Sequence, residues 1–221
     1  MRAVFSSIVV VLLIAVAGTT AGHTTGVETG PPIVQPGAPG EPSRMITATR
    51  AVDLSRVQHT AADVRFMQGM IGHHAQALDM TALVPTRSSR EDMRMLALRI
   101  KLSQEDEIKM IEDWLKVRGD EVPGVHDHHG PDGTLMPGML TAKEMNDLRE
   151  ATGVVFDRLF LEYMIKHHEG ALIMVDELLS TAGAGQETVI AAFASDVVAD
   201  QRAEMDRMTA MLIAMLKEQQ P

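Results

Sequence analysis

Two adjacent histidine pairs stand in copies of the same short sequence. FMQGMIGHHAQALDM occupies residues 66–80 and FLEYMIKHHEGALIM occupies residues 160–174, with aligned positions at a constant offset of 94 residues. The pairs are His73 with His74 and His167 with His168, each set among methionines. Imidazole nitrogen combined with thioether sulfur suits copper better than most metals. The duplication therefore predicts a metal-binding role, with copper as the favoured ion.

Further candidate ligands surround the histidine pairs and fill the segment between the two copies. Met70 and Met164 lie one helical turn before the pairs, and Met80 and Met174 close the copies. Adjacent residues of a helix diverge by about 100°, so the two histidines of a pair are not expected to bind one ion together. A second candidate site lies in segment 120–140, with His126, His128, His129, Met136 and Met139.

A structural role for the same histidines is the alternative interpretation. A second repeat, QEDEIKMIEDWL at 104–115 and QRAEMDRMTAML at 201–212, supplies polar partners at equivalent positions, namely Gln104, Glu107, Gln201 and Glu204. A carboxylate beside an imidazole can satisfy a buried histidine or orient a metal ligand, so these residues fit both interpretations. The histidines of segment 120–140 could likewise be solvated side chains of a polar loop. Met205, Met208, Met211 and Met215 are interpreted as core residues.

Long helices are needed to position these motifs. Apolar periodicity and end signals predict helices over about 60–84, 90–118, 154–180 and 186–217, with Ser89 as the N-cap of the second. Thr141 and Glu144 form a capping box that begins a further short helix. The predicted fold is all-α, a four-helix bundle built from two duplicated helical hairpins, with no β-strand of useful length.

The chain divides by composition into five segments. Residues 1–22 have the basic, apolar and small-residue pattern of a signal peptide. Residues 23–58 are predicted to be a flexible Pro/Gly-rich tether without packed structure. The first hairpin spans 59–119, a His/Met-rich connector 120–140 and the second hairpin 141–221. The signal-peptide pattern predicts a secreted, periplasmic or cell-envelope location. The protein would be attached to a membrane only if the signal is uncleaved.

Composition excludes several functional classes. The formal net charge is -10 and no run of Lys or Arg occurs, which argues against a nucleic-acid partner. The absence of cysteine excludes disulfides and thiolate metal sites. No Glu-x-x-His, Gly-x-Ser-x-Gly, Walker or His-Glu-x-x-His motif is present, so the protein is not expected to be an enzyme.

The two histidine motifs, together with MPGMLTAKEM and FDRLFLEYMIKHHEGALIM, resemble the DUF305 family over roughly residues 60–216. The resemblance implies one ferritin-like helical domain over about 59–221. Because the family includes copper-binding resistance proteins of the CopM type, it also implies copper binding through Met70, Met164 and the four paired histidines.

The sequence thus predicts an extracytoplasmic protein that sequesters or buffers copper, as Cu(I) or Cu(II), or confers resistance to it. Other divalent metals are compatible with the same ligands, and a copper-transfer protein is a possible partner. Two alternatives stay open: a protein-interaction module with structural buried histidines, and a metal-dependent redox enzyme. The oligomeric state is not predicted.

Overall fold

The computed structural model describes residues 33–35, 42–52, 57–124 and 134–218. The chain forms two compact units, residues 1–53 and 54–221. In the first unit, strands β1 (Ile33–Gln35) and β2 (Arg44–Ile46) pair antiparallel, with Ile33 opposite Ile46, and helix α1 (Ala48–Ala51) follows. The segment predicted to be a flexible tether therefore contains a short hairpin, and none of the described residues of β1, β2 or α1 is buried. The β-branched residues of both strands favour extended backbone, and their pairing satisfies the backbone hydrogen bonds.

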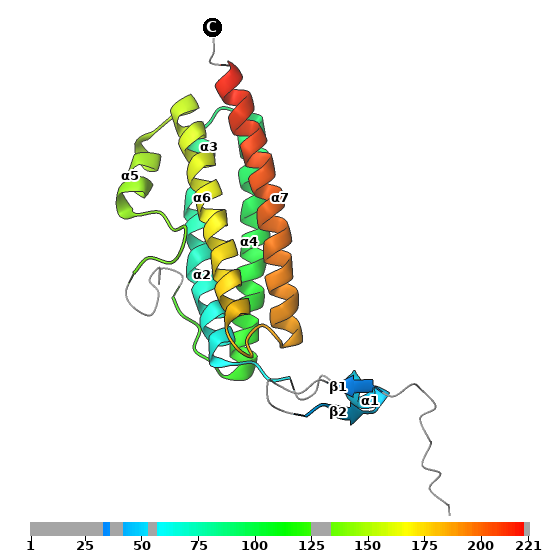
Figure 1. Ribbon diagram of the computed structural model, residues 1–221. Helices are drawn as coiled ribbons and strands as arrows, with labels where there is room; N and C mark the ends of the chain where they lie inside the picture. The colour runs from blue at the N-terminus through cyan, green and yellow to red at the C-terminus, as the bar shows by residue number, and fades with distance from the viewer. Residues whose placement is uncertain (1–32, 36–41, 53–56, 125–133, 219–221) are drawn as a thin grey trace, which may run out of the picture. The chain divides into compact units, whose positions relative to one another are not determined.

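The second unit is a four-helix bundle, which confirms the predicted fold class. Its long helices are α2 (Ala61–Thr81), α4 (Glu91–Arg118), α6 (Gly153–Ser180) and α7 (Thr188–Glu218), with short helices α3 (Val84–Arg87) and α5 (Ala142–Glu150). Helix α2 packs on α4, α6 packs on α7, and α2 packs on α6. Figure 1 shows α4 and α6 running in the same direction, so the connector between them travels back along the bundle.

Local capping explains where the helices begin and end. The predicted capping box of Thr141 and Glu144 is confirmed, and Gly119 ends α4 in the left-handed region at φ 76°. The predicted N-cap Ser89 is wrong: the N-cap of α4 is Arg90, and its side chain makes no capping bond. The Ser88 hydroxyl accepts from the backbone N–H of Arg90 at 3.1 Å. The side chain that caps this turn is therefore Ser88, one residue before the predicted Ser89.

A layer of polar side chains crosses the middle of the bundle and divides its apolar core in two. One apolar cluster contains Phe66, Ile111 and Val197, and the other contains Leu96 and Phe160. Each of the four long helices contributes to both clusters and places two polar residues between them. We call these eight residues the central polar layer: His73, His74, Gln104, Glu107, His167, His168, Gln201 and Glu204.

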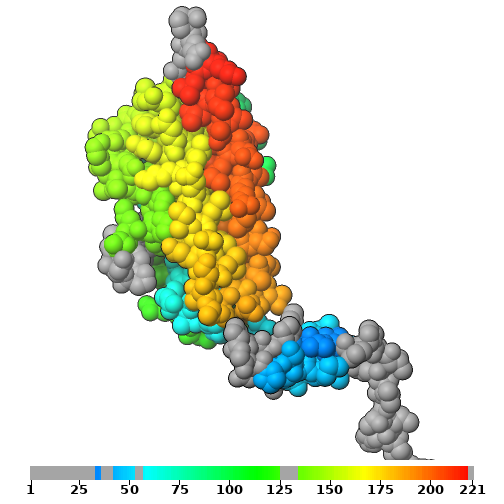
Figure 2. Space-filling model, viewed as in Figure 1, coloured from blue at the N-terminus to red at the C-terminus, as the bar shows by residue number. Residues whose placement is uncertain are grey.

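The last residues of the connector are fixed to the bundle rather than free. Gln76 of α2 donates its amide to the Leu140 carbonyl at 3.0 Å and accepts from the Leu140 N–H at 2.7 Å. On α6, the backbone of Pro137 and Gly138 lies directly against Gly170, where a Cβ atom would sit 2.0 Å from the Pro137 carbonyl oxygen. Figure 2 shows α5 and adjoining residues packed along the flank of α6. The end of the connector is therefore held by both hairpins.

The close approach of Pro137 to Gly170 predicts a large effect of Gly170→Ala. The new methyl group would overlap backbone atoms, so the connector must move, and we expect a loss of about 2–4 kcal/mol in the free energy of unfolding. Gly69→Ala is the matched control on α2. Its Cβ would meet only flexible methionine ends, Met136 Sδ and Met174 Cε, each at 3.3 Å. Urea denaturation of both variants checks this, and equal losses would contradict the proposed backbone contact.

Candidate metal centre

The four paired histidines meet at the centre of the bundle. Each of them is 0 % exposed. Where α2 crosses α6, the rings of His73 and His167 stack with centroids 3.9 Å apart and an interplanar angle of 37°. Within each pair the ring centroids are 6.3 Å apart. The two pairs thus meet across the bundle, and the neighbouring histidines of each pair diverge as expected.

The outer histidine of each pair contacts a glutamate of its own hairpin. Nε2 of His74 lies 2.6 Å from Oε2 of Glu107, and Nε2 of His168 lies 2.7 Å from Oε2 of Glu204. At His168 this contact is a hydrogen bond, and because a carboxylate accepts, it favours the tautomer with the proton on Nε2 and leaves the Nδ1 lone pair available. At His74 the two atoms are equally close but are not aligned for a hydrogen bond. The duplicated sequence therefore produces a duplicated contact, between α2 and α4 and between α6 and α7.

The two inner histidines are not equivalent. Nε2 of His73 lies 3.0 Å from the carbonyl oxygen of Pro137, to which it can donate. His167 has no hydrogen-bond partner at either ring nitrogen within the described part of the chain. The difference arises because a single connector joins the hairpins and its carbonyl reaches only one of the two copies.

Several buried nitrogen and oxygen atoms of the central polar layer lack partners among the residues that the structure describes. They are Nδ1 of all four histidines, Nε2 of His74 and His167, both amide atoms of Gln104, Oε1 of Gln201 and Oε2 of Glu107, which lies close to His74 Nε2 without making a hydrogen bond. A buried polar atom without a partner costs about 1–3 kcal/mol, so such a concentration is typical of a site that receives a ligand. Neutral imidazole nitrogen is the commonest protein donor to transition metals, and the layer fits such an ion chemically.

Burial keeps the inner histidines neutral. It lowers the pKa of His73 from 6.5 to about 3, with a further contribution from the neighbouring His74, while the Pro137 carbonyl acts in the opposite sense. The pKa of His167 is also lowered well below 6.5, first by burial and then by the adjacent His73. Metal ligation requires neutral imidazole, so both rings are held in the protonation state that an ion needs.

Thioether sulfur lies in the apolar clusters on both sides of the layer. Met70, Met174, Met136 and Met139 belong to one cluster, and Met80 and Met164 belong to the other. All six are buried. In the described residues no group of three or more His, Asp or Glu side chains forms a metal-binding cluster, so an ion bound with three or more ligands here would draw on other donors or on a small rearrangement.

The connector site is only partly visible. Met136 and Met139 lie in the core beside Met70 and Met174, whereas His126, His128 and His129 lie outside the described residues. Sequence reasoning missed the Pro137 carbonyl, which contacts His73, and Gln76, which holds the connector at Leu140. A polar Gln76 among buried residues of α2 was the available signal, because a buried amide requires a partner.

Together these features define an all-α bundle with a buried histidine–carboxylate layer formed by two related hairpins. The chain belongs to a family described as a domain of unknown function, DUF305, which matches residues 63–212. No curated protein matches the chain.

Solved structures with the same fold include family members and a metal-bound protein. A DUF305 fragment from Deinococcus radiodurans is 32% identical with a TM-score of 0.61, covering 70% of this chain and 97% of its own. A DUF305 protein from Streptomyces coelicolor is 28% identical with a TM-score of 0.61, and the match covers 70% of this chain and 93% of that protein. CopM in its Cu(II)-bound form is 27% identical with a TM-score of 0.55, and the match covers 69% of this chain and 96% of CopM. CopM was also solved in Cu(I)-bound and Ag-bound forms.

None of the helices described here combines the length and the apolar character needed to cross a bilayer.

The lowered pKa values predict how the metal-free fold responds to acid. A histidine that is neutral when folded but has a pKa near 6.5 when unfolded takes up its proton on unfolding. Stability therefore falls as the pH drops below 6.5, by about 1.4 kcal/mol per pH unit for each such histidine, until the folded pKa is reached, about 3 for His73. Urea denaturation of chelator-treated protein between pH 7 and 4 should show a shallower slope for His73→Gln. An unchanged slope would mean that His73 is not held neutral.

Proposed function

We propose that this protein binds copper outside the cytoplasm and sequesters or buffers it. The observation that carries the proposal is the central polar layer, in which four fully buried imidazoles each retain a ring nitrogen with no partner in the described part of the chain. A purely structural histidine is normally satisfied by hydrogen bonds. The unsatisfied nitrogens instead favour a layer that is completed by a bound ion.

The glutamates fit the role of groups that orient metal ligands. Glu107 and Glu204 contact the Nε2 side of His74 and His168, which directs the opposite Nδ1 lone pair toward an ion. Because the carboxylates occupy the far side of each ring, they need not bind the ion themselves. Candidate nitrogen ligands are therefore His74, His168 and the inner pair His73 and His167.

Copper is favoured over other ions by the donor chemistry. Imidazole binds Cu(II) more tightly than the other divalent first-row metals, and thioether sulfur extends the range to Cu(I). Met70 and Met164, one turn before the histidine pairs, supply sulfur on either side of the layer. The solved CopM structures contain Cu(I), Cu(II) and silver, which supports the same metals as cargo here.

Binding and release, rather than turnover, is the activity that this site supports. Protein ligands buried in a packed core suit retention of an ion, with a copper-transfer protein as the possible recipient. The signal-like pattern of residues 1–22 supports an extracytoplasmic location.

Copper titration tests the proposed function. We expect the purified protein to bind Cu(I) and Cu(II), and His74→Ala with His168→Ala to reduce the affinity for Cu(II) by at least about tenfold. Isothermal titration against a competing chelator measures the affinity for each of the two ions. His59→Ala is the matched control, because His59 is partly exposed and contacts Asp120 at 3.7 Å, away from the layer. Unchanged affinity in the double variant would favour a structural role for the histidines and an interaction module, while turnover of an oxidisable substrate would favour a redox enzyme.

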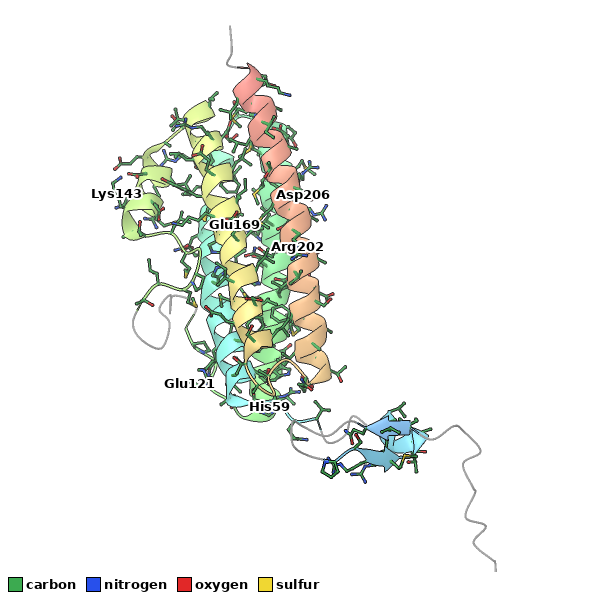
Figure 3. All side chains as sticks on the ribbon, in the orientation of Figure 1. His59, Glu121, Lys143, Glu169, Arg202 and Asp206 are labelled. Atoms are coloured by element: carbon green, nitrogen blue, oxygen red, sulfur yellow. The ribbon has the colours of Figure 1, made fainter. Side chains whose placement is uncertain are left out.

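The orienting role of Glu204 gives a separate prediction. Glu204→Gln keeps the side chain's size but removes the charge that faces His168, and we expect copper affinity to fall by about 10–100-fold. Glu169→Gln is the control, since Glu169 follows His168 directly but is exposed on α6 (Figure 3). Chelator competition compares the copper affinities of the two variants. Equal affinities would mean that Glu204 does not orient a metal ligand.

A further inference from the structure

Helices α4 and α7 come from different hairpins, and ion pairs link them at both ends. Arg90 contacts Glu218 at 3.1 Å at one end, and Arg118 contacts Glu187 at 3.2 Å at the other. Between these ion pairs the two backbones approach less closely than the helices within either hairpin. The middle of this α4/α7 seam is therefore formed by side chains, and it lies at the level of the central polar layer.

Carboxylates gather at the middle of the seam. Glu107 comes from α4 and Glu204 from α7, and Asp200 lies one turn before Glu204 on α7. The pKa of Asp200 is raised, first by partial burial and then by Glu107, Glu204 and Asp196, with Arg99 acting in the opposite sense. The three acids therefore share one region of negative potential.

These acids run from the surface to the imidazoles. Asp196 and Asp200 are exposed, whereas Glu204 is 5 % exposed and contacts the fully buried His168. Residues four apart lie on one side of a helix, so Asp196, Asp200 and Glu204 form a row along α7 that turns gradually toward the core. On α4, Glu107 is likewise partly exposed and contacts His74.

Buried amides behind the acids provide an independent sign of a ligand. Gln104 is 1 % exposed and Gln201 is 2 % exposed, and each lies one turn before a glutamate of the seam. Both amide atoms of Gln104 and Oε1 of Gln201 have no partner among the described residues. Residues three apart share a helix face, so these oxygens lie on the faces that also carry Glu107 and Glu204.

The connector side of the histidine layer is closed by comparison. The Pro137 carbonyl is bonded to His73, and the adjoining Gly138 lies against the α6 backbone at Gly170. A cation approaching from that side would have to displace a segment that Gln76 also holds.

We propose that metal cations enter the central polar layer through the α4/α7 seam, where Asp200 captures them and the negative charge of Glu107 and Glu204 draws them toward His74 and His168. This rests on the proposed copper binding and adds the route. Carboxylate oxygen is a weaker ligand for copper than imidazole nitrogen, so an ion held first by Asp200 can move on to the buried rings. A local negative potential raises the rate at which cations arrive.

Stopped-flow mixing with Cu(II), followed by a metal-indicator dye in solution, tests the route. We expect Asp200→Asn to lower the association rate about threefold at low ionic strength, with the effect shrinking at high salt. Copper stoichiometry at equilibrium should stay unchanged. Asp206→Asn is the matched control, because it makes the same change in net charge at an exposed position of α7 outside the row (Figure 3). Asp200→Glu should restore the rate.

The outcomes separate the route from the binding itself. A slower rate for Asp200→Asn alone, with unchanged stoichiometry, supports entry through the seam. Equal rates for Asp200→Asn and Asp206→Asn, in a protein that binds copper, overturn the route and leave the proposed function standing. Failure of the wild-type protein to bind Cu(II) or Cu(I) at equilibrium overturns both.

Discussion

The structure depends on the burial of a polar layer between two apolar halves of one bundle. Hydrophobic clusters above and below hold the four helices together, and the layer between them costs free energy wherever an atom lacks a partner. Contacts to Glu107, Glu204 and the Pro137 carbonyl offset part of that cost. The remaining unpartnered nitrogens are the part of the core that packing alone does not explain, and they coincide with the duplicated motif.

Duplication produced two equivalent hairpins, and the connector then made them different. Each hairpin supplies one histidine–glutamate contact, so the layer is nearly symmetric in its outer parts. At its centre the symmetry is lost, because the Pro137 carbonyl contacts His73 while His167 has no hydrogen-bond partner among the described residues. Methionines from the connector also enter only one of the two apolar clusters. A bound ion would therefore meet two different environments within one layer.

Much of this arrangement could be predicted from periodicity and repeats. The helical apolar spacing predicted four long helices, and the constant offset of 94 residues predicted two equivalent histidine pairs, but which histidines meet could not be read from it. The pairing of His74 with Glu107 could be anticipated as one of several options, because both residues belong to repeated segments. The contact of Pro137 with His73 could not, since a backbone carbonyl leaves no trace in residue type. The strands at 33–35 and 44–46 were also missed, because three-residue strands show too little alternation to detect.

The bidentate bond between Gln76 and Leu140 has a consequence for how two copies of this chain can interact. Proteins built from two similar hairpins can exchange one of them with a neighbouring molecule when the linker is loose. Here the linker is pinned to the first hairpin just before the second begins, and the glycine contact at Gly138 fixes it to α6 as well. Residues 137–140 would therefore travel with an exchanged second hairpin and make the same contacts in the neighbouring molecule, so any exchange must hinge in the chain before Pro137.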